Sequence, residues 1–203
     1  MAERKQIRCM ATDEYLEFEE QAAVRHEYVR GQIFAMTGSA EAHNVISGNL
    51  FAALHNFLQG TGCRVFQNDM KVRVEAADCF YYPDIMVTCE PYEAKSVFKN
   101  SPRLIIEVLS PSTKHIDRRE KLVAYRQLSS LRQYILVHQN KAQIEVYNKI
   151  SDTDWELTML RVLDELHLDA MPGKTLVLPV SRVYGGIDFP PLVKESEEEY
   201  EPA

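Results

Sequence analysis

Two acidic side chains stand alone in apolar stretches of this sequence. Asp84 opens the run DIMV, and Glu107 lies inside the run RLIIEVL. Both runs have the length and the β-branched content of buried strands. An ionised carboxylate in such a run costs free energy unless it is paired or binds a metal. Two of them, followed by Lys121 on the next helical segment, therefore indicate an assembled site.

The chemistry open to these residues is that of a hard cation. Strand side chains alternate between two faces, so Asp84 and Glu107 can converge if their strands are neighbours. Two carboxylates and a backbone carbonyl, such as that of Val108, suit Mg²⁺ or Mn²⁺ better than zinc. A cation there could polarise a phosphodiester and lower the pKa of a bound water. Lys121 could orient that water or stabilise the developing charge.

The elements that must position these residues can be read from periodicity and breakers. A helix capped by Thr12 runs to about Ala23, and the stretch RHEYVRGQIFAMT forms a hairpin around Gly31. Apolar residues at a helical period predict a second helix, capped by Ser39 and ending near Gln59. Further strands are expected at CRVFQ, MKVRVEA, Tyr81 to Cys89, Arg103 to Leu109, QYILVH, QIEVYNK and WELTMLRV, with a helix over residues 115–128. Residues 171–187 are expected to be irregular apart from a short strand and a helical turn.

Several motifs occur together in this order along the chain. They are PDI at Pro83 to Ile85, IEVLSPST at Ile106 to Thr113, and D-x-x-x-K at Asp117 to Lys121 with Tyr125. The combination resembles the Uma2 (DUF820) family, a branch of the restriction-endonuclease-like PD-(D/E)xK superfamily. The resemblance extends from about Thr12 to about Lys149.

The resemblance implies a fold and a site. The fold would be α/β (α+β), with a restriction-endonuclease-like mixed central sheet flanked by helices. The site would be a Mg²⁺-dependent nuclease site in which Asp84 and Glu107 bind the metal, Glu27 matches the preceding acid and Lys121 supplies the amine. The superfamily pattern has its lysine two positions after the second acid, where this chain has Leu109. Either the amine has moved to Lys121 or the catalytic role is lost.

Charge bears on the choice of partner. The net charge of −7 is unusual for a protein that binds nucleic acid, although an acidic tail carries much of it. A local basic surface can matter more than the total. Basic residues gather beside the expected site, at Lys114, Arg118, Arg119, Lys121, Arg126 and Arg132. These residues weaken the objection from net charge, and DNA stays the substrate that the family resemblance implies.

Length and cysteine usage set the remaining expectations. The 203 residues predict one domain over 1–190, followed by an acidic, disordered tail over 191–203. No apolar run is long enough to span a membrane, and no signal core is present at the start, so the cytoplasm is the expected location. The cysteines Cys9, Cys63, Cys79 and Cys89 show no C-x-x-C spacing, so free thiols are expected.

Three functions remain open at this point. The first is a Mg²⁺-dependent DNA endonuclease, which by analogy with the superfamily would work as a homodimer. The second is a module of the same fold that binds nucleic acid or protein without cleavage, as Leu109 and the acidic charge would allow. The third is a phosphoesterase acting on a small substrate. His43, near a helix start, could contact phosphate or the site, but a packed or surface histidine is the simpler interpretation.

Overall fold

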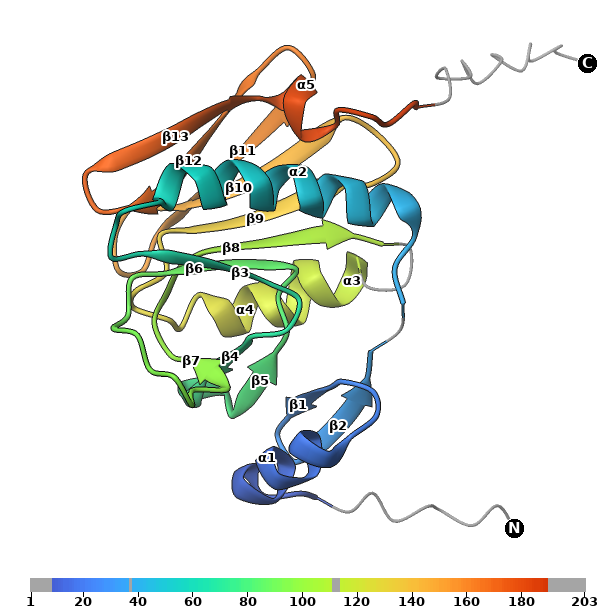
Figure 1. Cartoon of the computed structure of the whole chain (residues 1–203), viewed down its shortest axis with the longest axis vertical. Helices are drawn as coiled ribbons and strands as arrows, with labels where there is room; N and C mark the ends of the chain where they lie inside the picture. The colour runs from blue at the N-terminus through green and yellow to red at the C-terminus, as the bar shows by residue number, and fades with distance from the viewer. Residues whose placement is uncertain (1–8, 37, 111–113, 190–203) are drawn as a thin grey trace, which may run out of the picture.

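A six-stranded mixed sheet forms the centre of the molecule (Figure 1). The computed structural model describes residues 9–36, 38–110 and 114–189. The strand order is β11-β10-β9-β8-β6-β3, in which only β8 and β9 are parallel neighbours. The strands are β3 (Arg64–Gln67), β6 (Ile85–Thr88), β8 (Pro102–Leu109), β9 (Gln133–His138), β10 (Gln143–Lys149) and β11 (Trp155–Arg161).

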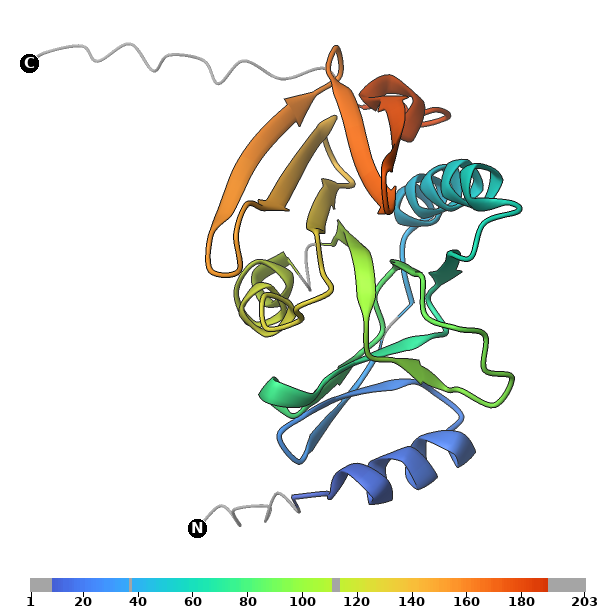
Figure 2. The same ribbon diagram turned by 90° about the vertical axis from the view of Figure 1, so that its left-hand side faces the viewer.

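Each face of this sheet buries its own apolar cluster. Helix α2 (Glu41–Leu58) covers one face, where Leu50 and Leu54 pack with Ile106 of β8. A hairpin of β12 (Glu165–Met171) and β13 (Lys174–Pro179), with the helical turn α5 (Val180–Val183), extends the same cluster. On the opposite face lies a continuous helical segment made of α3 (Lys114–Ile116), η2 (Asp117–Lys121) and α4 (Leu122–Tyr125) (Figure 2).

A second, five-stranded sheet lies at the other end of the molecule (Figure 1). Its strand order is β2-β1-β5-β4-β7. Tyr15 of α1 packs against Tyr28 and Phe80 of this sheet. The elements are α1 (Thr12–Gln21), β1 (His26–Val29), β2 (Gln32–Ala35), β4 (Lys71–Val74), η1 (Glu75–Ala77), β5 (Cys79–Tyr81) and β7 (Phe98–Lys99). The predicted hairpin around Gly31 is β1–β2, and Gly31 adopts a φ of 86° that favours glycine.

The single strand predicted from Tyr81 to Cys89 is wrong. The chain forms β5 in the five-stranded sheet, leaves it at Pro83 and enters the six-stranded sheet as β6. Pro83 has no N–H for a ladder bond and restricts the residue before it, so the strand breaks there. Asp84 is consequently placed at the point where the chain passes from one sheet to the other.

The two predicted helix caps need correction. Thr12 and Ser39 are not helix caps, because Ala11 and Ala40 hold the N-cap positions and neither provides a side-chain cap. In α1 the Glu14 carboxylate instead accepts the Ala11 N–H at 3.0 Å. The short strand and the helical turn expected within residues 171–187 are β13 and α5. The predicted acidic tail lies outside the described residues.

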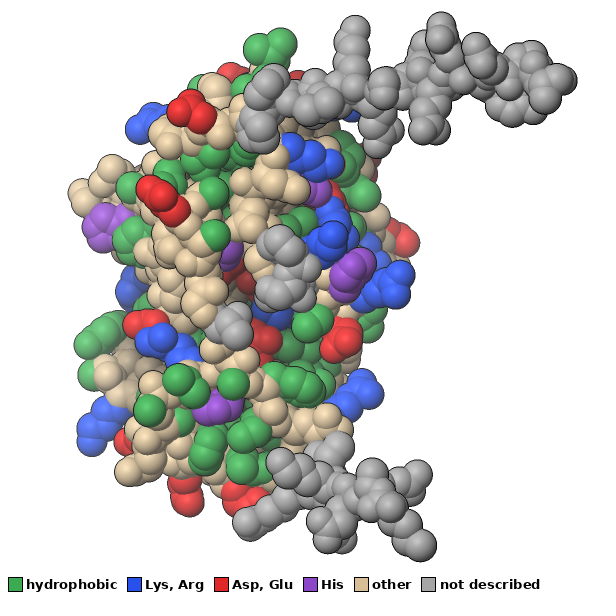
Figure 3. All heavy atoms as spheres, turned by 90° about the vertical axis from the view of Figure 1, so that its right-hand side faces the viewer, with side chains coloured by type: hydrophobic (Ala, Val, Ile, Leu, Met, Phe, Trp, Pro, Cys, Tyr) green, Lys and Arg blue, Asp and Glu red, His purple; other side chains and the backbone are tan. Residues whose placement is uncertain are grey.

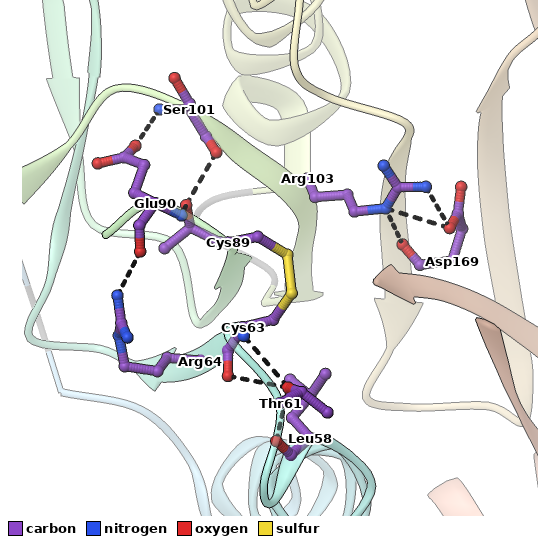
Figure 4. Close-up of a disulfide and its surroundings, with 10 residues drawn as sticks. Leu58, Thr61, Cys63, Arg64, Cys89, Glu90, Ser101, Arg103 and Asp169 are labelled. Atoms are coloured by element: carbon purple, nitrogen blue, oxygen red, sulfur yellow. Dashed lines mark hydrogen bonds and ion pairs between the residues drawn. A yellow bond between two sulfur atoms is a disulfide. The ribbon is translucent and has the colours of Figure 1, made fainter. Parts of the chain in front are cut away.

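The expectation of free thiols is wrong for two of the four cysteines. Cys63 and Cys89 form a disulfide (Figure 4). Cys9 and Cys79 are free. Arg64 and Thr88 are register partners of β3 and β6, so the disulfide joins the next positions of the same strand pair. The C-x-x-C criterion detects only cysteines close in sequence and could not find this pair. The disulfide fastens the edge strand β3 to its neighbour.

No helix in the described part of the chain is long and apolar enough to cross a membrane. The prediction of one domain over residues 1–190 stays a prediction.

Loss of the disulfide should lower stability. The two cysteines are 26 positions apart, and a cross-link that closes a loop of that size destabilises the unfolded chain by about 3.5 kcal/mol. Cys63→Ser should therefore lower the free energy of unfolding by about this amount, measured by urea denaturation. Cys9→Ser, at an exposed free thiol, is the matched control. Equal midpoints for Cys63→Ser and Cys9→Ser would contradict the contribution assigned to the disulfide.

Candidate functional site

A buried lysine lies at the centre of the candidate site. The Nζ atom of Lys121 is 2.9 Å from Oε1 of Glu27, 3.1 Å from Oε1 of Glu107 and 3.4 Å from Oδ1 of Asp117. Lys121, Glu107 and Asp117 are each at most 5% exposed. The structure thus brings three of the predicted residues together and adds Asp117, which was not among them.

The partners of Lys121 come from three separate parts of the chain. Glu27 projects from β1 of the five-stranded sheet and Glu107 from β8 of the six-stranded sheet. Asp117 and Lys121 are the first and last residues of η2, a π-helical stretch. A π-helical turn is wider than an α-helical turn and is often found at functional sites. Here it directs both side chains toward the sheet, where they are buried.

Glu107 points to the side of β8 that alternation predicts. Ile105 and Leu109 belong to the cluster under the helical segment, and Leu104, Ile106 and Val108 belong to the cluster under α2. Glu107 is on the first of these faces, where the Tyr125 hydroxyl donates to its Oε1 at 3.2 Å. Tyr125 and Lys121 both bond Oε1 from the helical segment, so this segment holds the Glu107 carboxylate in place.

Asp84 is held against the end of β8. Its backbone N–H donates to Oε2 of Glu107 at 3.3 Å, and its Oδ2 accepts the Val108 N–H at 2.7 Å. Strand register explains this, since Ile85 pairs with Ile106 and Asp84 is therefore next to Glu107. The two acids predicted to converge do lie side by side.

The Val108 carbonyl is directed to the same side of β8 as Asp84. The Val108 N–H donates to Oδ2 of Asp84. Because the N–H and C=O of one strand residue point to the same side of the strand, the Val108 carbonyl oxygen is also directed toward the segment that holds Asp84. Its role as a metal ligand stays a prediction.

His43 is a contact of the site that sequence reasoning ranked too low. Its Nε2 is 3.1 Å from Oδ2 of Asp84, and the side chain is buried on α2. Its Nδ1 has no hydrogen-bond partner in the described part of the chain.

The presence of Asp117 in the site could have been predicted from the sequence, because its spacing from Lys121 places both residues on one side of a helical turn.

The electrostatics of the cluster are set by burial and by its excess of acids. Burial raises the pKa of the Glu107 carboxyl well above its ordinary value, and the Lys121 ammonium opposes that rise without cancelling it. Burial alone would lower the pKa of the Lys121 amine. The carboxylates of Glu107, Glu27 and Asp117 outweigh burial and hold the pKa of Lys121 well above its ordinary value. The amine is therefore a cation at neutral pH.

The donor set fits a hard divalent cation in its chemistry. Asp84, Glu107 and the Val108 carbonyl offer oxygen atoms, which Mg²⁺ and Mn²⁺ prefer. Oδ1 of Asp84 makes no hydrogen bond to another described residue. Within residues 9–36, 38–110 and 114–189, no three His, Cys, Asp or Glu side chains already stand in the arrangement of a metal cage. A cation would thus draw on two acids and main-chain oxygen.

The chain is similar to known proteins along most of its length. The model of the Uma2 family, described as "Putative restriction endonuclease", matches residues 12–181. "Uncharacterized protein slr1290" of Synechocystis sp. (strain ATCC 27184 / PCC 6803 / Kazusa) is 36% identical over 181 residues, covering 89% of this chain and 94% of that protein. "Uncharacterized protein sll1609" of the same organism is 33% identical over 150 residues, covering 72% and 85%.

A solved structure shares the fold. It is described as "a putative nuclease belonging to DUF820 from Anabaena variabilis ATCC 29413", and it superposes with a TM-score of 0.68 at 17% identity over 85% of this chain and 96% of that one. At this identity the likeness shows the fold alone. It confirms the predicted α+β class with a restriction-endonuclease-like sheet. The match over most of the chain to the family model and to both relatives shows that this protein belongs to the Uma2 family.

Proposed function

We propose that this protein is a divalent-metal-dependent endonuclease that hydrolyses phosphodiester bonds of DNA. The observation that carries the proposal is the Lys121 amine held by Glu27, Glu107 and Asp117, with Asp84 against Glu107. Two acids that can hold a cation and an amine that can stabilise developing charge together can support the hydrolysis of a phosphodiester. The family description and the nuclease-type fold support the same reaction class.

Asp84, Glu107 and the Val108 carbonyl would hold Mg²⁺ or Mn²⁺. When bound, the cation supplies Lewis acidity to the phosphodiester and lowers the pKa of a water molecule. Asp84 is ready for this role because the Val108 N–H and His43 already fix its Oδ2. Glu107 is fixed through Oε1 by Lys121 and Tyr125.

Lys121 replaces the lysine that the superfamily carries on the strand. Leu109 occupies that strand position and is buried under the helical segment. The amine instead reaches Glu107 from η2, so the same kind of contact is made from another element. A fixed ammonium there can donate to the attacking water or to the charge that develops on the phosphate. Glu27 and Asp117 position the amine.

A second candidate is a module of this fold that binds nucleic acid or protein without cleavage. One observation favours it, namely that all three carboxylates around Lys121 already use its ammonium. Leu109 at the usual lysine position points the same way. This candidate predicts that divalent cations are not bound. The predicted homodimer stays a prediction under either function.

The catalytic roles can be tested by cleavage. Asp84→Asn, Glu107→Gln and Lys121→Met should each lower the rate of plasmid nicking in Mg²⁺ or Mn²⁺ by about 100-fold or more, since each removes a charge from the reacting centre. Glu93→Gln, at an exposed acid, should cleave like the wild type. Cleavage that persists in Asp84→Asn and Glu107→Gln would assign the activity to another site or to a contaminant.

Metal binding separates the two candidate functions. Calorimetric titration with Mn²⁺ should show binding to the wild-type protein and its loss in Glu107→Gln, because the amide cannot act as an anionic ligand. The Glu93→Gln variant again serves as the control. A wild-type protein that binds no Mn²⁺ would favour the module without catalysis.

The raised pKa of Glu107 predicts a pH dependence of stability. The ordinary pKa of this carboxyl is 4.5, and in the folded state the group keeps its proton to a higher pH. The free energy of unfolding of the wild-type protein therefore falls as the pH rises from 4.5 toward the pKa of the folded state. Glu107→Gln does not titrate. Between about pH 4.5 and neutral pH its free energy of unfolding should therefore rise relative to the wild type, by about 1.4 kcal/mol for each unit of pKa shift that lies in this range.

Urea denaturation in EDTA at several pH values measures this difference, with Glu93→Gln as the variant expected to track the wild type. The opposite trend, in which the wild type gains on Glu107→Gln as the pH rises, would mean that Lys121 outweighs burial and lowers the pKa of Glu107.

A further inference from the structure

A cavity of about 310 Å³ opens where the parallel strands β8 and β9 end. Basic side chains from three elements line it. Lys114 and Arg118 belong to the helical segment, His138 ends β9, and Lys141 follows in the turn to β10. In the space-filling view of this end of the molecule, Lys and Arg side chains gather beside His (Figure 3).

The guanidinium of Arg118 is held in place at this cavity. Its Nε donates to Oε2 of Glu145 at 3.4 Å and its Nη2 to Oε1 of Glu145, while His138 Nε2 is 2.9 Å from the same Oε1. Glu145 is 5% exposed. Burial raises its pKa, but the bonds from His138 and Arg118 outweigh burial and hold the pKa of Glu145 at about 2. The carboxylate stays ionised and fixes the guanidinium.

Three basic side chains at the cavity have donor groups that no described residue pairs with. Nη1 of Arg118 makes no hydrogen bond to a described residue. Lys114 and Lys141 are exposed, and neither forms an ion pair within the described ranges. One guanidinium edge and two ammonium groups therefore face a space that Glu145 only partly neutralises. Such a set recognises phosphate oxygens.

The cavity lies on the same face as the Lys121 cluster. Leu109 lines it and follows Glu107 by two residues on β8, a step of roughly 7 Å along a strand. In the parallel register Glu107 is beside Leu136, and Leu109 is beside His138. Arg118 also follows Asp117 directly in η2. A nucleic-acid strand bound at Glu107 and Lys121 would place one of its neighbouring phosphates near this cavity.

We propose that the cavity binds a backbone phosphate of the DNA strand, adjacent to the phosphodiester that is cut. The assignment of the strand as DNA rests on the proposed function. Arg118 is the fixed anchor of this subsite, and Lys114 and Lys141 contribute long-range charge. The cavity is a positioning subsite and takes no part in the bond-breaking step.

The test is DNA affinity as a function of salt, measured in EDTA so that no cleavage occurs. Fluorescence anisotropy of a labelled duplex should show weaker binding by Lys114→Ala and Lys141→Ala. The slope of log K against log salt should fall for each lysine, by up to about 0.9, the value for one full phosphate contact on duplex DNA. Lys174→Ala, at an exposed lysine on β13 of the separate hairpin, removes the same charge and should retain the wild-type slope.

Arg118→Lys tests the anchor without leaving Glu145 unpaired. It keeps the positive charge and loses the planar fork, so binding at fixed salt should weaken severalfold while the urea midpoint stays near that of the wild type. Weaker binding without loss of the fold would show that the geometry of Arg118 matters, rather than its ion pair alone. Wild-type affinity in Arg118→Lys would overturn its role as the anchor.

The failure of this subsite and the failure of the nuclease are distinguishable. Slopes of Lys114→Ala and Lys141→Ala equal to that of Lys174→Ala, or no binding of DNA by the wild type, would overturn the subsite whether or not the protein cleaves. Reduced slopes in a protein that never cleaves would support the subsite and overturn the nuclease. Competition with DNA by inorganic phosphate at micromolar concentration, seen for the wild-type protein and not for the cavity variants, would overturn the proposal and assign the cavity to a small phosphate ligand.

Discussion

The ion contacts of Lys121 are the constraint on which the rest of the site depends. Charges removed from water are costly, and each is tolerated only while its partners remain. Glu27, Glu107 and Asp117 surround the Lys121 ammonium, so removing any one of them changes the balance for the others. A cluster of this composition is poor as a device for stability alone. Its cost is better understood as that of holding reactive groups in place.

Strand alternation and register explain how much of this site could be predicted. Glu107 in an apolar run had to face one side of a buried strand, and Asp84 had to lie near it once the two strands paired. Lys121 could be expected on the covering helix, where the structure places it. The inferences about the two acids need only a period of two residues and adjacency of strands.

The remaining features depend on contacts that are distant in sequence or on local backbone that propensities do not encode. The π-helical stretch from Asp117 to Lys121 directs both side chains to the sheet. The amino-acid composition of this stretch does not predict a π-helical turn. The split of the segment Tyr81 to Cys89 follows from Pro83, but the change of sheet at Asp84 does not. The Cys63–Cys89 disulfide required the pairing of β3 with β6 to be known first.

The passage of the chain between two sheets has a mechanical consequence. Glu27 belongs to the five-stranded sheet and Lys121 packs on the six-stranded sheet, so their ion pair joins the two sheets. A ligand that draws the amine or the carboxylate away must break this ion pair, and the two events are then thermodynamically linked. By reciprocity, the free energy by which the bound ligand weakens the contact between the sheets equals the free energy by which that contact lowers the affinity for the ligand.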